Sequence, residues 1–219
     1  MADRVSAGDV SDATDEPIRC DWSTGNADLL EYHDREWGRP TTDPHRLFEK
    51  ICLEGFQSGL SWLTILRKRE NFRRAFADFD LETVAAYGEP DVDRLLADAG
   101  IIRHRGKIEA TINNARRAIE LVEAEGSLTD WIWSWAVADS EMDVDADGRA
   151  VLQANTPRSV ALAKELKRRG WRFFGPTTAY AFMQSEGLVN DHLPGCFVRA
   201  ECEAERQAFL AGRELRHFT

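Results

Sequence analysis

The sequence has no long apolar run and little that alternates in the manner of a β-strand. Its 219 residues contain no uninterrupted apolar stretch of 18, and the first 17 residues, MADRVSAGDVSDATDEP, hold no apolar block of the kind found in secretory signals. We therefore expect no membrane span and a cytoplasmic location. In that compartment the four cysteines are more often metal ligands or free thiols than disulfide partners.

Charge and length bound the sequence further. The 38 acidic residues outnumber the 28 Lys and Arg residues, and the formal net charge is −10 at pH 7. This excess argues against non-specific affinity for phosphate groups, although a local basic patch remains compatible with nucleic-acid binding. The length suits one large domain or two small ones. We expect a disordered acidic leader at residues 1–17, a main domain at 18–200 and a C-terminal extension at 201–219.

Helix start and stop signals recur along the chain and favour an all-α fold of eight to ten helices. Four stretches combine an N-terminal Asp, Thr or Pro signal with a C-terminal Gly: residues 43–55, 80–88, 156–170 and 175–187. A fifth stretch, 106–126, repeats apolar residues on one helix face. Only WRFFG (171–175) and EMDVDADGRAVL (141–152) resemble strands.

A short basic connection between two helices indicates the class of partner. Gly100 and Gly106 frame the segment GIIRHRG, which leads from one predicted helix into the next. Exposed N–H groups at a helix N-terminus bind anions, and four residues add positive charge there: Arg103, His104, Arg105 and Lys107. These features favour a DNA phosphate. The alternative is a helical hairpin with a solvated basic turn.

One carboxylate falls on an apolar helix face. In DPHRLFEKICLEGF, Glu54 lies on the same stripe as Leu47 and Ile51, where an unpaired charge is costly. Either the helix end bends and exposes Glu54 to water, or Glu54 faces a ligand pocket. Aromatic residues near it in sequence, Trp37 and Trp62 among them, are suitable walls for a flat, cationic, nitrogen-bearing ring.

Two Cys and two His residues are candidates for a metal site. His192 and Cys196 stand four residues apart in VNDHLPGC, and Cys20 and His33 are thirteen apart near the start of the main domain. Together they would form a tetrahedral Cys2His2 zinc site, with no open position for reactive water. The alternative is a turn that uses both residues in a core. Other members of the same residue types remain substitutes: Cys52, Cys202, His45, His104 and His217.

Six blocks in fixed order resemble the DNA-3-methyladenine glycosylase I family: CDW, YHDREWG, LFEKICLEGFQSGLSW, KRENFRRAF, DAGIIRHRGKIEATINNA and AFMQSEGLVNDHLPGC. The resemblance runs from about Cys20 to Cys196. It implies a helix–hairpin–helix fold with GIIRHRG as the hairpin, and the main domain at 18–200 as the glycosylase domain. It also implies one structural zinc ion per chain, bound by four residues: Cys20, His33, His192 and Cys196.

By the same resemblance, Glu54 and Tyr32 read the edge of the methylated base and carry the reaction. Trp62 is similar to the stacking wall, with Trp22 and Trp37 beside it. Gly59 and Leu60 resemble the element that enters the gap left in DNA. Phe56 is a departure, because the family usually has a small or polar residue there.

The function implied is a monomeric base-excision glycosylase that flips 3-methyladenine out of alkylated double-stranded DNA and releases it as the free base. Methylation at N3 makes the base cationic, so the glycosidic bond is weak without protonation. No Lys residue stands in an evident Schiff-base context, and strand cleavage is not expected. Asp130 precedes WIW as a predicted helix cap rather than a catalytic acid. The alternative is a non-catalytic helix–hairpin–helix module that only binds DNA damage.

Overall fold

The structure is a computed structural model that describes residues 16–138 and 153–216. Within these ranges the chain forms ten α-helices, two 3-10 helices and no β-strand, which confirms the all-α prediction. In chain order they are η1 (Asp21–Ser23), α1 (Ala27–Arg35), α2 (Pro44–Gln57), α3 (Trp62–Ala75), η2 (Ala77–Phe79), α4 (Leu81–Ala85), α5 (Glu89–Ala97), α6 (Arg105–Glu125), α7 (Leu128–Trp133), α8 (Pro157–Arg168), α9 (Pro176–Ser185) and α10 (Arg199–Leu210).

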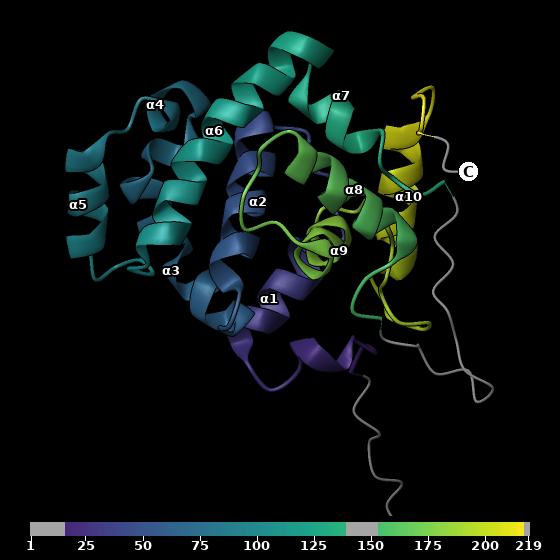
Figure 1. The fold of residues 1–219 in the computed structure, drawn as a ribbon. Helices are drawn as coiled ribbons and strands as arrows, with labels where there is room; N and C mark the ends of the chain where they lie inside the picture. The colour runs from purple at the N-terminus through teal and green to yellow at the C-terminus, as the bar shows by residue number, and fades with distance from the viewer. Residues whose placement is uncertain (1–15, 139–152, 217–219) are drawn as a thin grey trace, which may run out of the picture.

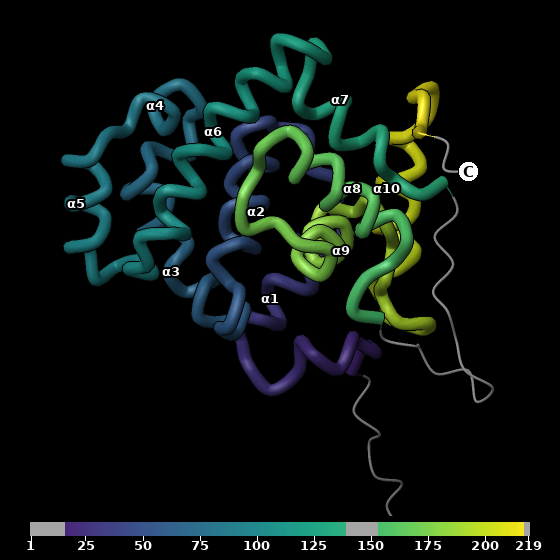
Figure 2. The backbone as a smooth tube through the Cα atoms, in the orientation of Figure 1, coloured from purple at the N-terminus to yellow at the C-terminus, as the bar shows by residue number. Residues whose placement is uncertain are grey.

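Helix α2 lies at the centre of the molecule (Figures 1 and 2). Helices α3 to α6 pack on one side of it, and α8, α9 and α10 lie on the other, with α1 below. The core joins both sides through aromatic side chains, and Trp131, Trp133 and Trp135 are buried in it. Among the described residues, no helix is long and apolar enough to span a membrane.

The predicted helix starts are confirmed, while one predicted stop is wrong. Asp43 caps α2 by accepting hydrogen bonds from the backbone N–H groups of residues 45 and 46, and Thr156 caps α8. Helix α2 continues past Gly55 to Gln57, and Gly55 instead allows the backbone of Phe173 to approach the helix closely. A Cβ atom there would lie 3.1 Å from the carbonyl oxygen of Phe173.

Phe173 belongs to the loop at 171–175, which is not the strand that its sequence suggested. Its φ of 54° interrupts any extended run. The other strand candidate, residues 141–152, lies outside the described residues.

Helix α10 covers the core next to α7. Phe209 packs against Trp133 with ring centroids 4.5 Å apart, and Arg206 donates a hydrogen bond to the carbonyl of Leu188 at 3.3 Å. The expected boundary after residue 200 therefore falls inside a helix that begins at Arg199. The N-terminal cap of α7 is Ser127, so the prediction that Asp130 caps this helix is wrong. Asp130 instead forms an ion pair with Arg213 on the surface.

Candidate active site and metal centre

A cavity of about 280 Å³ opens between α1, α2, α3 and the end of α9. Its wall consists mainly of aromatic and charged side chains: Tyr32, Arg35, Glu36, Arg39, Pro40, Thr41, Arg46, Glu49, Lys50, Leu53, Trp62, Arg69, Arg73, Ser185 and Glu186. Several arginines are held by carboxylates, for example Arg69 by Glu36. The cavity thus combines two aromatic walls with a surround of paired charges.

Glu54 is buried beside this cavity, as its position on the apolar stripe indicated. Only 5% of its surface is exposed, so the helix end does not bend to bring it to water. Burial raises the pKa of the carboxyl group, and the ammonium of Lys50, with Nζ 3.2 Å from Glu54 Oε1, opposes that rise. Glu54 itself is not part of the cavity wall, and it meets the cavity through Lys50.

Lys50 links the carboxylate to both aromatic walls. Its Nζ atom donates a hydrogen bond to the hydroxyl of Tyr32 at 2.5 Å and lies 3.6 Å from the ring centre of Trp62. The rings of Tyr32 and Trp62 are 5.4 Å apart. Among the described residues, the buried indole N–H of Trp62 has no hydrogen-bond acceptor.

The other two predicted wall residues lie further from the cavity. Trp22 packs on Tyr32, with ring centroids 6.2 Å apart, and is 40% exposed. Trp37 packs edge-on against His192 at 4.6 Å and against Trp22 at 5.1 Å. Neither tryptophan is part of the cavity wall. Their contact with a base remains a prediction.

The charged residues of the cavity wall were missed from the sequence, and two of them, Lys50 and Glu186, bear directly on the pocket. Lys50 stands four residues before Glu54 and three after Leu47, so the stripe that marked Glu54 also contained it. Glu186 follows α9, is buried, and accepts a hydrogen bond from Thr41. Burial raises the pKa of Glu186 to about 7, against the attraction of Lys50.

Phe56 does not reach the cavity. It is 1% exposed and packs against Phe72, with ring centroids 4.6 Å apart. Its side chain therefore packs in the core and is not part of the cavity wall.

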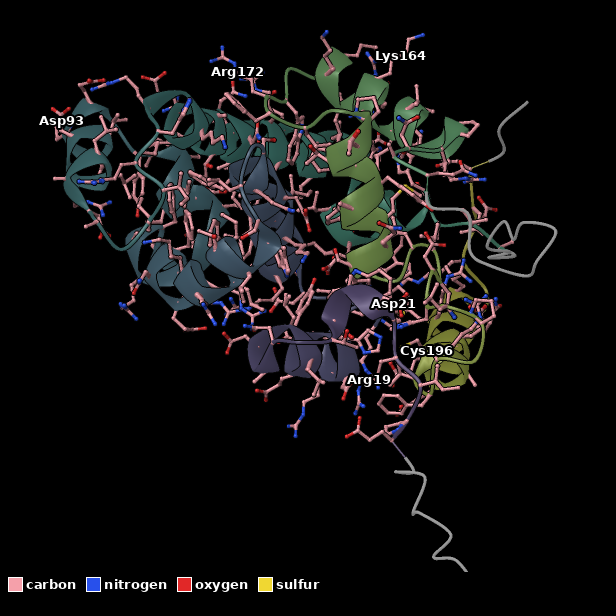
Figure 3. All side chains as sticks on the ribbon, turned by 90° about the horizontal axis from the view of Figure 1, so that it is seen from below. Arg19, Asp21, Asp93, Lys164, Arg172 and Cys196 are labelled. Carbon is pink, nitrogen blue, oxygen red and sulfur yellow. The ribbon has the colours of Figure 1, made fainter. Side chains whose placement is uncertain are left out.

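The four predicted metal ligands come together in the structure. The donor atoms of Cys20, His33, His192 and Cys196 all lie within 4.8 Å of one another, and all four residues are buried. Figure 3 shows Arg19, Asp21 and Cys196 together at one end of the molecule, away from Asp93 on α5. The group therefore joins the start of the described chain to the segment before α10.

The hydrogen bonds around this group leave one nitrogen of each histidine facing the sulfurs. His192 donates from Nε2 to the carbonyl of Trp37 at 3.0 Å, and its Nδ1 lies 3.7 and 3.6 Å from the two cysteine sulfurs. The Nδ1 atom of His33 contacts the carboxylate of Asp34 at 2.8 Å, which Arg19 also holds. Such outer contacts fix the ring orientation of metal-binding histidines.

The substitute ligands are not part of this group. Cys52 is buried in α2 and lies outside the four-residue group, while Cys202 lies beyond His192, with its sulfur 3.5 Å from Nε2. His45 and His104 are part of other contacts, with Phe79 and the start of α6. His217 lies outside the described residues.

The basic connection between α5 and α6 runs over residues 98–104. Arg103 is exposed, and His104 caps α6 by accepting the N–H of Lys107 at 3.2 Å. Arg105 forms ion pairs with three acidic side chains: Glu89, Asp93 and Glu109. Gly106 is the second residue of α6, and a Cβ atom there would contact His104.

Lys107 has contacts that its sequence position did not suggest. The side chain is buried, and Nζ donates hydrogen bonds to the carbonyls of Phe56 at 2.9 Å and Ser58 at 2.7 Å. It therefore ties the end of α2 to α6 instead of pointing into solvent. After Ser58 the chain continues through Gly59, whose φ is 81°, and Leu60, which is 41% exposed. These two residues form an exposed tip.

Comparison with known proteins gives concordant matches. The sequence model described as methyladenine glycosylase matches residues 22–199. DNA-3-methyladenine glycosylase 1 of Escherichia coli (strain K12) is 49% identical over 178 residues, covering 81% of this chain and 95% of that protein. The DNA-3-methyladenine glycosylase of Haemophilus influenzae is 46% identical, covering 81% and 96%.

A solved structure of 3-methyladenine DNA glycosylase I from Staphylococcus aureus, which concerns 3-methyladenine recognition, has a TM-score of 0.76 at 35% identity. It covers 83% of this chain and 96% of that chain.

Proposed function

The chain belongs to the methyladenine glycosylase family, and from that membership we propose that it removes 3-methyladenine from alkylated double-stranded DNA in base-excision repair. One observation in the structure carries the proposal. A buried carboxylate, Glu54, is paired with Lys50, and Lys50 lies against the rings of Tyr32 and Trp62 in the wall of an open cavity. This combination suits a flat cationic base, since the rings stack on it and the carboxylate balances its charge.

The chemistry asks little of an acid. A base methylated at N3 carries a positive charge and leaves with the electron pair of the glycosidic bond, so the protein must extrude and hold it. Glu54 and Tyr32 hold the base edge, and Trp62 stacks on the ring. The negative charge of Glu54 also favours the positive charge that develops on the sugar as the bond breaks.

We propose that helices α5 and α6, with the connection at 98–104, act as a helix–hairpin–helix that binds the DNA backbone. The start of α6 offers N–H groups to a phosphate, and Arg103 is exposed beside it. Because Lys107 ties this helix to the Gly59–Leu60 tip, a phosphate bound at the hairpin fixes where the tip meets the DNA. The tip then enters the gap left by the extruded nucleotide.

The buried Cys2His2 group is proposed to hold one structural zinc ion. Two thiolates and two neutral imidazoles are a typical zinc donor set, and the outer contacts of His33 and His192 fit it. Zinc supplies cross-linking energy there and no reactive water, because protein fills all four positions. The ion would tie the first helices to the segment before α10.

We propose that residues 18–200 are the glycosylase domain of a monomer and that 201–219 extend it, with helix α10 crossing this boundary and packing on the core. The prediction of an acidic leader at 1–17 falls almost entirely outside the described residues. The protein is proposed to act without cutting the strand. Lys50 lies in the wall of the pocket, although no lysine had been expected in a position to form a Schiff base. The absence of strand cleavage is therefore measured directly.

The test uses double-stranded DNA methylated at N3 of adenine. We expect release of free 3-methyladenine, an intact strand until the abasic site is cleaved by alkali, and no covalent product on borohydride reduction. Tight binding of damaged DNA with no base release would identify a binding module instead. Strand nicking with borohydride trapping that disappears in Lys50→Met would identify a Schiff-base enzyme.

A further inference from the structure

The protein itself supplies a cation, Lys50, at the place where a cationic base is expected. The Nζ atom of Lys50 lies 3.6 Å from the ring centre of Trp62, which is a stacking distance, and 3.2 Å from the carboxylate of Glu54. It also contacts Tyr32. We propose that Lys50 is a specificity-determining residue that a base must displace, so that the pocket accepts cationic bases and rejects neutral ones. This inference rests on the function proposed above.

The charges of the pocket explain the selectivity. Lys50 and Glu54 are both almost fully buried, at 7% and 5% exposed, so each compensates the other in a region that excludes water. A cationic base that takes the position of Nζ restores a partner to Glu54. A neutral base displaces the same ammonium and leaves a buried carboxylate unpaired, which is strongly unfavourable.

The cavity offers a second position for the displaced ammonium. Lys50 is part of the cavity wall, so its flexible side chain has open space into which it can turn. Two carboxylates on the same wall interact electrostatically with Lys50: Glu186 and Glu36. Glu36 is held by Arg69, whereas Glu186 is held by hydroxyl groups of Thr41 and Ser185. Glu186 is therefore the acceptor that best suits the displaced lysine.

The reaction reverses the charge balance. When the N9–C1′ bond breaks, its electron pair stays on N9 and the base becomes neutral, while the positive charge passes to the sugar. Water then adds its oxygen to C1′ and gives up a proton to solvent. The neutral product no longer pairs with Glu54, so the ammonium of Lys50 returns to the carboxylate and expels the base. The same residue thus selects the charged substrate and promotes product release.

The test compares two ligands, 3-methyladenine at pH 8, where it is neutral, and 3,9-dimethyladeninium, a fixed cation of similar shape. Their dissociation constants are measured for the wild type, Lys50→Met and Lys50→Gln. Lys164→Met on the exposed face of α8 is the matched control. Both Lys50 variants should bind the neutral base at least about ten-fold more tightly, equivalent to about 1.4 kcal/mol. The preference for the cation over the neutral base should also shrink, because without the Lys50 ammonium the burial of Glu54 raises its pKa further and favours the neutral carboxyl group.

An unchanged or weaker affinity for neutral 3-methyladenine in both Lys50 variants, with melting curves that show folded protein, would overturn the proposal. A crystal structure of the wild type with the cation provides an independent check. Lys50 Nζ should have left Glu54 and Trp62, and a lysine still seated on both would also overturn it. Because wild-type base release from methylated DNA is measured separately, a failure here leaves the proposed glycosylase function standing.

Discussion

Replacing Lys107 with Met tests whether this residue is the structural link between helix α6 and the segment that leads to Gly59 and Leu60. The variant keeps an apolar stem of similar length and removes the ammonium that donates to the carbonyls of Phe56 and Ser58 at 2.9 and 2.7 Å. A hydrogen bond to a charged group contributes about 1.5–3 kcal/mol. Two such bonds, partly offset by better burial of the Met side chain, give an expected loss of about 2–4 kcal/mol in the free energy of unfolding.

For a domain of this size the loss corresponds to a fall in melting temperature of roughly 5–15 °C. Lys68→Met is the matched control, because Lys68 donates to the carbonyls of Ala99 and Gly100 at 3.0 and 3.1 Å but is more exposed. It should lose about 1 kcal/mol or less. Thermal and urea denaturation of both variants provide the assay. Equal melting temperatures for Lys107→Met and the wild type, or equal losses in the two variants, would refute the reasoning.

Three further predictions concern charge and metal. Burial raises the folded-state pKa of Glu186 from 4.5 to about 7, so between these values the folded protein keeps a proton that the unfolded chain has lost, and stability falls as pH rises. Glu186→Gln should therefore be more stable than the wild type at pH 8, by at most about 3 kcal/mol, and no gain in urea denaturation would argue against it. Cys196→Ser should lose zinc and melting temperature together, and full zinc content in metal analysis would contradict the proposed ligand. Arg103→Ala should flatten the salt dependence of DNA binding more than Arg105→Ala, since Arg105 is already paired with acidic side chains, and equal slopes would count against this difference.

Local sequence signals were sufficient for the helices and for Glu54. Caps such as Asp43 and Thr156 act within four residues, so their effect depends little on the rest of the fold. Spacing alone fixes which residues share a helix face, and it placed Glu54 on the apolar face of α2. Of the two outcomes that this position allowed, the structure shows burial. Gly55 was misread as a stop because its actual purpose, the approach of the Phe173 loop, is a contact made 118 residues along the chain.

The rest of the pocket depends on contacts between distant segments. Lys50 shares the stripe with Glu54, yet a lysine on a helix usually extends its charge into water. Only the approach of Tyr32 and Trp62 from α1 and α3 encloses it. Lys107 is a second example. Its positive charge beside Gly106 predicted a phosphate contact, whereas its ammonium donates hydrogen bonds to backbone carbonyls of a distant segment.

The Cys2His2 group was predictable from local sequence only in part. The His192 and Cys196 pair was visible as a local spacing, whereas its union with Cys20 and His33 was one of several combinations that the sequence allowed. The structure brings these four together because the segment before α10 folds back against α1 and η1. The hydrogen-bond partners that orient the two histidines could not be read from composition or spacing.

The central claim is that Glu54 stabilises a cationic base and the charge that develops as it leaves. The most direct test measures single-turnover release of 3-methyladenine from methylated duplex DNA by the wild type and Glu54→Gln, together with their affinity for that DNA. Glu54→Gln keeps the shape of the side chain and removes its charge. The account predicts DNA binding within a few-fold of the wild type and base release slowed roughly 100-fold or more. Release at the wild-type rate by a folded Glu54→Gln protein would contradict it.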